Sequence, residues 1–514
     1  MSELDTPTML PAVDRRTGSI IGEVPVLDAA SVTAAVEQAR TAQAAWAGLS
    51  HRARRRHLLE FRRALVSSGD RLAETLAAET GKPLSDAWLE IAGGCAMITY
   101  AAHTAHRALR RRSISTWPIV VKRAYVEYSP YGVIGAITPW NYPVAISMQV
   151  IPFALAAGNA VVVKPSELVP LTGMLIGEIA TAAGLDVVKV VTGAGATGEA
   201  LVRSGVDKIA FTGSGTTARR ILATAAESLT PVVMELGGKD AMIVCDDADV
   251  RQAARAAVGA AFNNAGQACI ATERALVTAS VYDAFLREVL ETVATLEVGP
   301  GQTAHVGAVT RPEQIAVVER RLRDAVAAGA RVVAGGSPLP SDGGCYYPPT
   351  VVVDVDPRSE LAQEESFAPV LAVMRVPDAD TAIRIANDSN YALNGSVFTR
   401  RRRRGRDLAG QLVAGGVNIN DAMFGAAIPG LPFGGERRSG YGRLQGVEGL
   451  REFSRIKSVV EPRLAGLPPL TARVFAGRKL QPATWRRLVT MGYGARAGKR
   501  MRRSSEVTDR SGRR

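Results

Sequence analysis

The sequence feature that most constrains the fold is a series of short β-branched runs separated by helical stretches. Between Val133 and Leu236 these runs cover residues 160–164, 187–191, 208–211 and 231–235. A second series extends from Asp240 to about Thr399, with runs at 241–244, 351–355 and 370–374. Strands that are apolar on both faces are typical of parallel sheets covered by helices. We therefore predict an α/β fold with two parallel-sheet lobes and a cleft between them.

The segments around this core have other patterns. Apolar residues recur at helical spacing over 34–46 and 52–78, after an extended entry at 19–26. Residues 119–128 alternate as a strand does, and 130–132 form a turn. Five consecutive arginines, Arg400–Arg404, follow a strand at 394–399, and we interpret them as a solvated helix start rather than a phosphate site.

The net charge of +13 is concentrated at the C-terminus. Residues 463–514 contain 14 basic and two acidic side chains, which leaves +1 for residues 1–462. Residues 480–489 could form a short amphipathic helix, and the rest of this extension reads as partly disordered. A solvated tail is the simpler interpretation, and attraction to an anionic membrane surface is the alternative. No nucleic-acid partner is expected.

The remaining composition predicts a cytoplasmic protein without a metal site. The N-terminus lacks the basic and apolar regions of a signal peptide, and no run of 18 apolar residues occurs. Four widely spaced cysteines and five scattered histidines favour neither disulfides nor a metal site.

Three motifs contain candidate catalytic residues, and each has a simpler structural explanation. Cys269 follows a helix end at 263–266 and could be a loop thiolate, although a buried structural cysteine is the better reading of this motif alone. Glu235 ends a strand just before two glycines. Its carboxylate could be a salt-bridge partner or a base. Asn141 lies in a loop between two prolines. It could be an ordinary turn residue, or its amide could donate to an oxyanion.

Three further motifs could bind a dinucleotide. Gly193, Gly195 and Gly198 form G-x-G-x-x-G between a strand and a helix, without a clear acidic residue about twenty positions later. Lys164-Pro-Ser-Glu167 ends a strand with a cation and a carboxylate that suit ribose hydroxyls. Phe211-Thr-Gly-Ser214 opens a helix whose free N–H groups could bind an anion.

Taken in order, these motifs resemble the aldehyde dehydrogenase superfamily. The likeness rests on Pro139-Trp-Asn141, Lys164–Glu167, Phe211–Ser214, Glu235–Lys239 and Gly266–Cys269, and continues through 364–370, 387–394 and 432–443. It covers about residues 15 to 460 and is somewhat similar to bacterial enzymes of the succinate-semialdehyde dehydrogenase type.

The resemblance implies a role for each motif. Cys269 matches the nucleophile that forms a thiohemiacetal and then a thioester, Glu235 the base that activates the hydrolytic water, and Asn141 the oxyanion donor. Because members that transfer the acyl group to coenzyme A typically lack this glutamate, Glu235 favours hydrolysis. The implied cofactor residues are Thr138, Pro139, Trp140, Lys164, Ser166, Glu167, Gly193, Gly213, Ser214, Leu236, Gly237, Glu365 and Phe367. The Glu167 carboxylate would repel a 2′-phosphate, so NAD is expected to be preferred and NADP is possible.

The substrate is left open by the resemblance. The candidate pocket residues are Tyr142, Gln149, Asn263, Ala268 and Ile270. Many oxidisers of semialdehyde acids carry arginine where Gln149 and Asn263 stand, so we expect a neutral aliphatic or aromatic aldehyde, with succinate semialdehyde as the alternative. A thiol acyltransferase would need a histidine base, and none lies near a motif. A scaffold that binds cofactor without turnover is a third possibility.

The resemblance also implies a domain order and an oligomer. We expect a NAD-binding domain at 1–236, a catalytic domain at 237–440, a return segment at 441–462 and the basic extension at 463–514. Residues 115–132, together with the segment around 455–460, should form a small β oligomerisation element of a homodimer or homotetramer.

Overall fold

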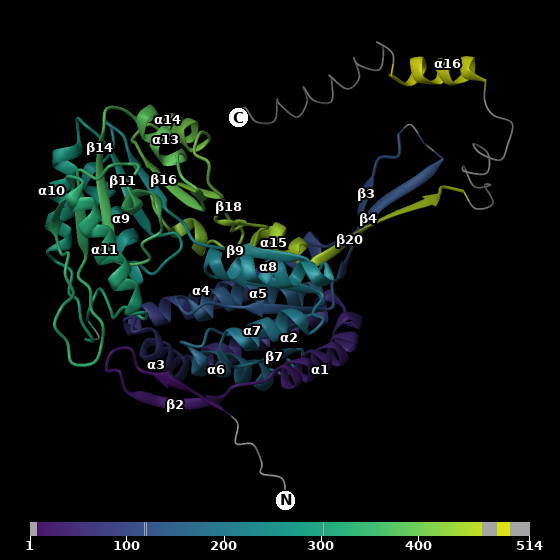
Figure 1. Cartoon of the computed structure of the whole chain (residues 1–514). Coiled ribbons are helices and arrows are strands. Elements are labelled where there is room, and N and C mark those ends of the chain that lie inside the picture. Colours follow the sequence, from purple (N-terminus) through teal and green to yellow (C-terminus); the bar gives the residue numbers. More distant parts are fainter. Residues whose placement is uncertain (1–7, 118, 120, 302, 465–480, 494–514) are drawn as a thin grey trace, which may run out of the picture. The chain divides into compact units, whose positions relative to one another are not determined.

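The computed structural model describes residues 8–117, 119, 121–301, 303–464 and 481–493. The chain divides into two compact units (Figure 1). Unit 1 comprises residues 1–109 and 129–455, and unit 2 comprises residues 110–128 and 456–514. The predicted boundary between a NAD-binding and a catalytic domain at 236/237 falls inside unit 1 and stays a prediction.

The first large sheet of unit 1 has the strand order β19-β9-β8-β5-β6-β7. Its strands are parallel except for β19, which is antiparallel to β9. Their bounds are β5 Val133–Ile137, β6 Ala160–Lys164, β7 Val188–Val190, β8 Lys208–Thr212, β9 Val232–Glu235 and β19 Gly440–Tyr441. The connecting helices are α5 Pro143–Ala157, α6 Pro170–Ala182, α7 Gly195–Arg203 and α8 Gly215–Ser228. The predicted strands at 160–164, 187–191, 208–211 and 231–235 are therefore confirmed.

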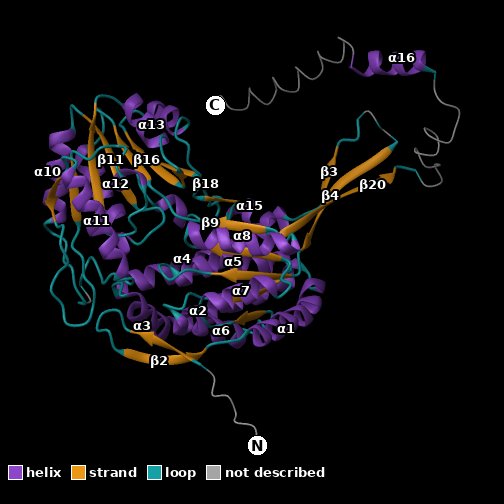
Figure 2. Cartoon of the chain, viewed as in Figure 1, coloured by secondary structure: helices purple, strands orange, loops and turns teal. Residues whose placement is uncertain are grey.

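The second large sheet has the order β12-β13-β14-β11-β10-β16-β17, and only β12 is antiparallel to its neighbour. The strands are β10 Asp240–Val244, β11 Thr272–Thr278, β12 Arg331–Ala334, β13 Thr350–Val353, β14 Val370–Val376, β16 Asn394–Phe398 and β17 Gly416–Ile419. Its helices are α9 Val250–Phe262, α10 Tyr282–Val293, α11 Glu313–Ala327, α12 Glu360–Gln363, α13 Ala379–Asn387 and α14 Arg402–Ala409. Figure 2 shows these helices packed around the strands, and the predicted architecture of two parallel-sheet lobes is confirmed.

The N-terminal segment contains a hairpin and four helices. They are β1 Met9–Val13, β2 Ile20–Pro25, α1 Ala29–Gly48, α2 His51–Ser67, α3 Gly69–Thr80 and α4 Leu84–Ala108. The helical pattern predicted over 52–78 is confirmed and is divided between α2 and α3, because α2 ends at Ser67 and its C-cap, Ser68, leaves helical geometry. Gly69 then allows close packing, since a Cβ there would lie 2.4 Å from the Trp88 ring.

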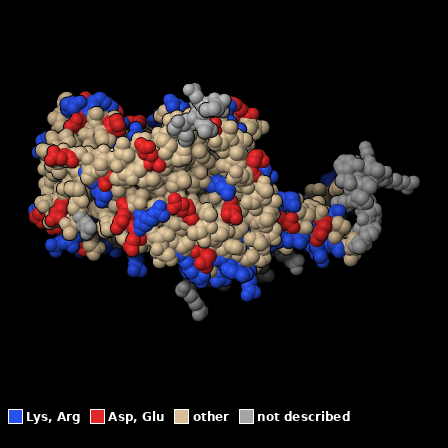
Figure 3. Space-filling model, turned by 90° about the horizontal axis from the view of Figure 1, so that it is seen from below, with Lys and Arg blue, Asp and Glu red and all other residues tan. Residues whose placement is uncertain are grey.

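Shorter elements complete unit 1. They are β15 Tyr391–Ala392, β18 Glu436–Arg437, α15 Gly446–Glu452, and the 3-10 turns η1 Asn263–Gly266 and η2 Phe424–Ala427. In the arginine run, α14 begins at Arg402 as expected, and Arg404 pairs with Asp246 at 2.7 Å and with Asp247 at 3.0 Å. Basic and acidic side chains are interspersed on the face shown in Figure 3.

Strands β20 Ser454–Pro462, β4 Lys122–Pro130 and β3 Arg112–Ile114 form a three-stranded sheet in that order. The predicted strand at 119–128 is thus present but begins at Lys122. Helix α16, Pro482–Tyr493, matches the predicted amphipathic helix. The rest of the basic extension after residue 464 lies outside the described residues. No helix in the described segments has the length and apolar character needed to cross a bilayer.

Candidate active site

A cavity of about 1460 Å³ in unit 1 is lined by residues from both lobes. One wall comes from the C-terminal ends of β5, β6, β8 and β9 and from the start of α8, and the other includes Cys269, Glu365 and Phe367. Ligands in open α/β folds bind at this end of parallel strands. Fourteen of the predicted site residues line the cavity: Thr138, Pro139, Trp140, Asn141, Lys164, Ser166, Glu167, Gly213, Ser214, Leu236, Gly237, Cys269, Glu365 and Phe367.

The loop before Cys269 has a constrained backbone. Three consecutive residues, Asn264, Ala265 and Gly266, have left-handed φ values of 50°, 55° and 70°. Only Gly266 adopts this conformation without a Cβ penalty, which is about 1–2 kcal/mol for other residues. The Gln267 side chain holds the loop, because its Nε2 donates to the Asn264 carbonyl at 3.0 Å and its Oε1 accepts from Thr310 N at 2.8 Å. Cys269 therefore sits on a fixed turn rather than on a loose loop.

Asn141 is tied to this turn. Its side-chain Nδ2 donates to the backbone carbonyl of Gln267 at 3.0 Å. The backbone carbonyl of Asn141 accepts from Asn264 Nδ2 at 3.0 Å and from Lys82 Nζ at 2.8 Å. The side chain is only 4% exposed. One amide N–H is thus used to orient the side chain, and the second can donate to a ligand at Cys269.

A buried ion pair supports Asn141 from behind. Lys82 Nζ lies 2.6 Å from Glu90 Oε2, and neither side chain has any exposed surface. Glu90 Oε1 also accepts from Val144 N at 2.7 Å and from Ala145 N at 3.0 Å, which satisfies the first turn of α5. The sequence did not reveal this pair, because Lys82 lies in the short connection between α3 and α4 and nothing in its spacing to Glu90 marks either charge as buried.

Glu235 lies at the end of β9 with a carboxyl group that is 2% exposed. Neither of its oxygens has a hydrogen-bond partner. Burial raises the pKa of this carboxyl well above its ordinary value, and the charge of Arg443 offsets the shift only in part. A buried carboxyl whose pKa is raised in this way is a candidate for a general base or acid. Glu235 is not among the lining residues of the cavity, but its charge acts on Cys269.

The pKa of the Cys269 thiol is raised well above its ordinary value. Burial is the main cause, and the negative charges of Glu235 and Glu365 add to it. The thiol is therefore neutral when no positive ligand is present, and a base must remove its proton before it can attack.

The cofactor wall has features that fit a dinucleotide. Ser214 caps α8 and accepts from Thr217 N at 3.3 Å, so the first turn of that helix faces the cavity with free N–H groups. Lys164 Nζ lies 3.4 Å from Glu167 Oε2. Thr138 Oγ1 is buried without a hydrogen-bond partner. A Cβ on Gly237 would lie 2.2 Å from Glu365 Oε2, so a larger residue there would displace the Glu365 carboxylate.

Gly193 has a different position from the other predicted cofactor residues. It is not among the residues that line the cavity. A Cβ there would lie 2.0 Å from Thr197 Oγ1, and its φ is 147°. Close packing at the start of α7 explains this glycine without a ligand.

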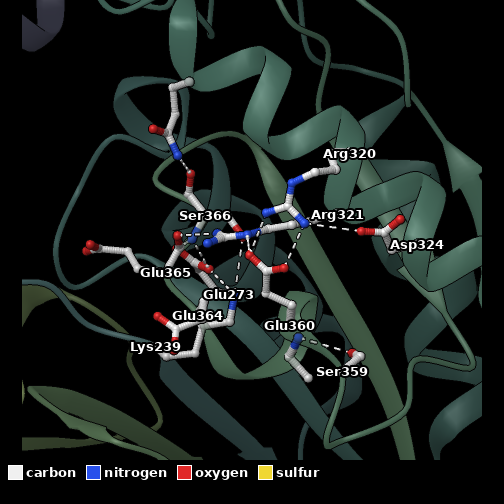
Figure 4. Close-up of polar contacts among 12 residues, drawn as sticks. Lys239, Glu273, Arg320, Arg321, Asp324, Ser359, Glu360, Glu364, Glu365 and Ser366 are labelled. Atoms are coloured by element: carbon white, nitrogen blue, oxygen red, sulfur yellow. Dashed lines mark hydrogen bonds and ion pairs between the residues drawn. The ribbon is translucent and has the colours of Figure 1, made fainter.

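The loop with Glu365 and Phe367 is held by charged side chains that sequence reasoning missed (Figure 4). The Glu273 carboxylate accepts from Ser366 N at 2.9 Å and from Phe367 N at 3.1 Å, and it pairs with Lys239. Arg321 Nη1 donates to the Glu365 carbonyl at 2.6 Å. Lys239 is the last residue of the motif at 235–239, and this position was the one signal in the sequence that could have drawn attention to it. Burial and the charge of Glu273 raise the pKa of Glu365 to about 8.

The roles of the five predicted substrate-pocket residues stay predictions. None of Tyr142, Gln149, Asn263, Ala268 and Ile270 is among the residues that line this cavity. Tyr142 donates through its hydroxyl to Asn263 Oδ1 at 2.6 Å, and Lys82 Nζ is 4.5 Å from its ring centre. Gln149, Ala268 and Ile270 are buried. Among the described residues, no cluster of three or more His, Cys, Asp or Glu could hold a metal ion.

Comparison with known proteins agrees with this geometry. The model of the aldehyde dehydrogenase family matches residues 3–459. The chain is 38% identical to 4,4'-diapolycopene aldehyde oxidase of a Methylomonas species, over 87% of this chain and 84% of that protein. It is 37% identical to a probable succinate-semialdehyde dehydrogenase [NADP(+)] of Sinorhizobium fredii, over 86% of this chain and 90% of that protein.

Solved structures give the same result. An NAD-dependent aldehyde dehydrogenase from Sinorhizobium meliloti superposes with a TM-score of 0.86 at 33% identity, covering 90% of this chain and 93% of that one. The resemblance inferred from the motifs is therefore confirmed. The chain belongs to the aldehyde dehydrogenase family and is an NAD(P)-dependent aldehyde dehydrogenase.

Proposed function

We propose that the chain oxidises a neutral aldehyde to the carboxylic acid through a thioester on Cys269, which water activated by Glu235 hydrolyses. The observation that carries this proposal is the Glu235 carboxyl, which is buried, unpartnered and electrostatically coupled to Cys269. A buried carboxyl without a partner lowers the stability of the fold, so its presence beside Cys269 favours a chemical role.

The first step forms a carbon–sulfur bond. The Cys269 thiol gives its proton to solvent water, and the thiolate attacks the aldehyde carbon, so that the carbonyl oxygen becomes an oxyanion. The second N–H of Asn141 Nδ2 and the Cys269 backbone N–H donate to this oxygen. A comparable oxyanion donor contributes roughly 3–4 kcal/mol. Bound NAD(P)+ supplies the hydride acceptor whose reduction leaves a thioester on Cys269.

The second step breaks the carbon–sulfur bond. Glu235 accepts a proton from water, the hydroxide attacks the thioester carbon, and Cys269 leaves as a thiolate. The cofactor would be held by the α8 start with Ser214, by Lys164 and Glu167 at the ribose, and by Glu365 and Phe367 beside the nicotinamide. Because the carboxylate of Glu167 disfavours a 2′-phosphate, we propose that NAD is preferred over NADP.

The substrate proposal rests on the missing cation. Gln149 and Asn263 provide no positive charge, and the Lys82 ammonium is taken up by Glu90 and the Asn141 carbonyl. A free carboxylate on the substrate would therefore find no partner at these three positions, although arginines such as Arg311 and Arg438 line the same cavity. Succinate semialdehyde is the second candidate, because a relative at 37% identity bears that name.

The test measures reduced cofactor by absorbance with propanal and with succinate semialdehyde, each with NAD and with NADP. We expect turnover with NAD, a higher kcat/KM for propanal, and no turnover by Cys269→Ala. Full turnover by that variant would refute the thioester route. Cofactor binding without turnover by the wild-type enzyme would favour a binding scaffold.

Assembly and location are also proposals. We infer a homodimer or homotetramer, with 115–132 and the segment around 455–460 as an interface element, and light scattering would give the mass. Attraction of the basic extension to an anionic membrane is tested by vesicle co-sedimentation, which should be lost when residues 465–514 are deleted. Equal binding of both forms would reject it.

A further inference from the structure

The active-site cavity has an excess of basic side chains. Eight basic and five acidic side chains line it. Five of the basic ones are held by carboxylates or backbone carbonyls, as Arg438 is by Glu364 at 3.3 Å. The other three, Arg219, Arg220 and Arg311, have no ion pair and no side-chain hydrogen bond within the described part of the chain. A cavity with this balance of charge favours an anionic ligand.

Arg311 comes from a different wall of the cavity than the other two unpaired arginines. Arg219 and Arg220 belong to α8, on the wall that also contains Ser214. Arg311 lies two residues before α11, a helix of the second large sheet, and its side chain is exposed. It is therefore the one unpaired cation that the described residues place on the cysteine side of the cavity.

The backbone before Arg311 is fixed to the turn that carries Cys269. Thr310 N donates to Gln267 Oε1 at 2.8 Å, and Thr310 Oγ1 donates to the Thr80 carbonyl at 2.6 Å. Thr310 is 1% exposed, so water does not compete for these two bonds. Gln267 lies two residues before Cys269. Arg311 is therefore one residue away from a direct hydrogen bond to the cysteine turn.

The backbone after Arg311 is fixed to the loop that contains Glu365. Gln314 N donates to the Arg311 carbonyl at 3.0 Å, and Gln314 Nε2 donates to the Ser366 carbonyl at 2.7 Å. Further along α11, Arg321 Nη1 donates to the Glu365 carbonyl at 2.6 Å (Figure 4). Arg311 therefore lies on a segment that is fixed between the cysteine turn and the loop proposed to lie beside the nicotinamide.

Among the described residues, no carboxylate pairs with Arg311. The acidic residue closest to it in sequence, Glu313, does not line the cavity, and its charge acts on Arg15 and Cys345 instead. A guanidinium group has five N–H donors in a planar fork, which matches two oxygens of a phosphate or a carboxylate. The Arg311 guanidinium is therefore available to an anion in the cavity.

The cofactor brings an anion that the residues assigned so far do not neutralise. The pyrophosphate of NAD carries two negative charges. The start of α8 with Ser214 offers N–H groups and about half a positive charge. Lys164 is already paired with Glu167. A neutral aldehyde brings no charge, so the pyrophosphate is the group in the cavity that most needs a further cation.

We propose that Arg311 binds the pyrophosphate of NAD(P)+ from the cysteine wall, so that the phosphates lie between its guanidinium and the start of α8. This inference rests on the proposed function and adds to it a cofactor ligand from the second lobe. A carboxylate on the substrate is the competing occupant, and the experiment separates the two.

The experiment measures the Kd values of the full chain for NAD, ADP and adenosine by isothermal titration calorimetry. ADP keeps the pyrophosphate without the nicotinamide, and adenosine has no phosphate. In Arg311→Gln, the Kd values for NAD and ADP should both rise about tenfold or more, because a charge-assisted contact to phosphate is lost. The Kd for adenosine should stay at the wild-type value. Arg311→Lys keeps the charge without the planar fork and should recover part of the loss.

Arg255→Gln is the matched control. Arg255 is an exposed arginine of α9 that does not line the cavity and has no ion pair in the described segments. This variant lowers the net charge of the chain by the same amount as Arg311→Gln. All three of its Kd values should therefore equal those of the wild type.

Other outcomes overturn the proposal. Unchanged Kd values for NAD and ADP in Arg311→Gln would do so, as would an equal rise for adenosine or in the control. If only the KM for succinate semialdehyde rises in Arg311→Gln, the arginine binds a substrate carboxylate instead. Failure of the proposed function is distinguishable, because the wild type would then bind NAD with the expected dependence on Arg311 but would oxidise no aldehyde.

Discussion

The buried pair of Lys82 and Glu90 allows a prediction that separates stability from catalysis. Lys82→Met leaves the Glu90 carboxylate buried without its cation and removes one donor from the Asn141 carbonyl. Breaking a fully buried pair in this way costs about 3–5 kcal/mol of unfolding free energy. Displacement of Asn141 lowers kcat by a factor on the order of 10², as expected when an oxyanion donor loses its position.

The double variant Lys82→Met/Glu90→Leu tests this reasoning further. An apolar pair of similar volume removes the uncompensated charge, so most of the stability returns. A deficit of about 1–2 kcal/mol remains, because Val144 N and Ala145 N lose their acceptor. The value of kcat stays low, since the Asn141 carbonyl still lacks the ammonium donor.

The assay is urea unfolding followed by circular dichroism at one protein concentration, together with steady-state kinetics. Arg71→Met is the matched control, because its ion pair with Glu178 at 3.0 Å is exposed and contributes no more than about 1 kcal/mol. Wild-type stability and kcat in Lys82→Met would refute the account of the pair. Recovery of kcat in the double variant would refute the link to Asn141.

Two further predictions concern the cofactor side of the cavity. The pKa of Glu365 is raised to about 8, so its carboxyl becomes a charged acceptor for ribose hydroxyls only as pH rises through that value. The Kd for NAD, followed by quenching of Trp fluorescence, should therefore fall between pH 7 and pH 9. The variant Glu365→Gln should remove this dependence on pH. A pH-independent Kd in wild type would contradict it. Glu273→Gln keeps a side chain of the same size but weakens the hydrogen bonds that it accepts from Ser366 N and Phe367 N. The KM for NAD should rise about tenfold or more, with little change in the KM for propanal. Equal increases in both KM values would show a general structural defect instead.

Much of the fold could be predicted from the sequence because its local signals agree. Continuous β-branched runs such as 160–164 indicate buried strands wherever they occur, and Gly266 before Cys269 marks a turn that only glycine tolerates easily. The helical pattern over 52–78 was predicted correctly, but periodicity alone does not detect the break between α2 and α3 at Ser68, beside which Gly69 packs against Trp88.

The supporting residues of the site could not be predicted in the same way. Lys82, Glu90 and Glu273 are buried charges, and their burial depends on contacts with backbone groups of residues 141–145 and 366–367, which are distant in sequence. Gln267 orients Asn141 through its backbone carbonyl, which no side-chain pattern reveals.

The central claim is that Cys269 carries the acyl group and that Glu235 is needed to release it. Glu235→Gln keeps the shape of the side chain but cannot accept a proton from water. Intact-mass spectrometry of this variant after mixing with propanal and NAD tests the claim directly. We predict one propanoyl group per chain, located on Cys269 by peptide mapping and absent without NAD or in Glu235→Gln/Cys269→Ala. A variant that turns over at the wild-type rate, or that carries the acyl group on another residue, would contradict the account.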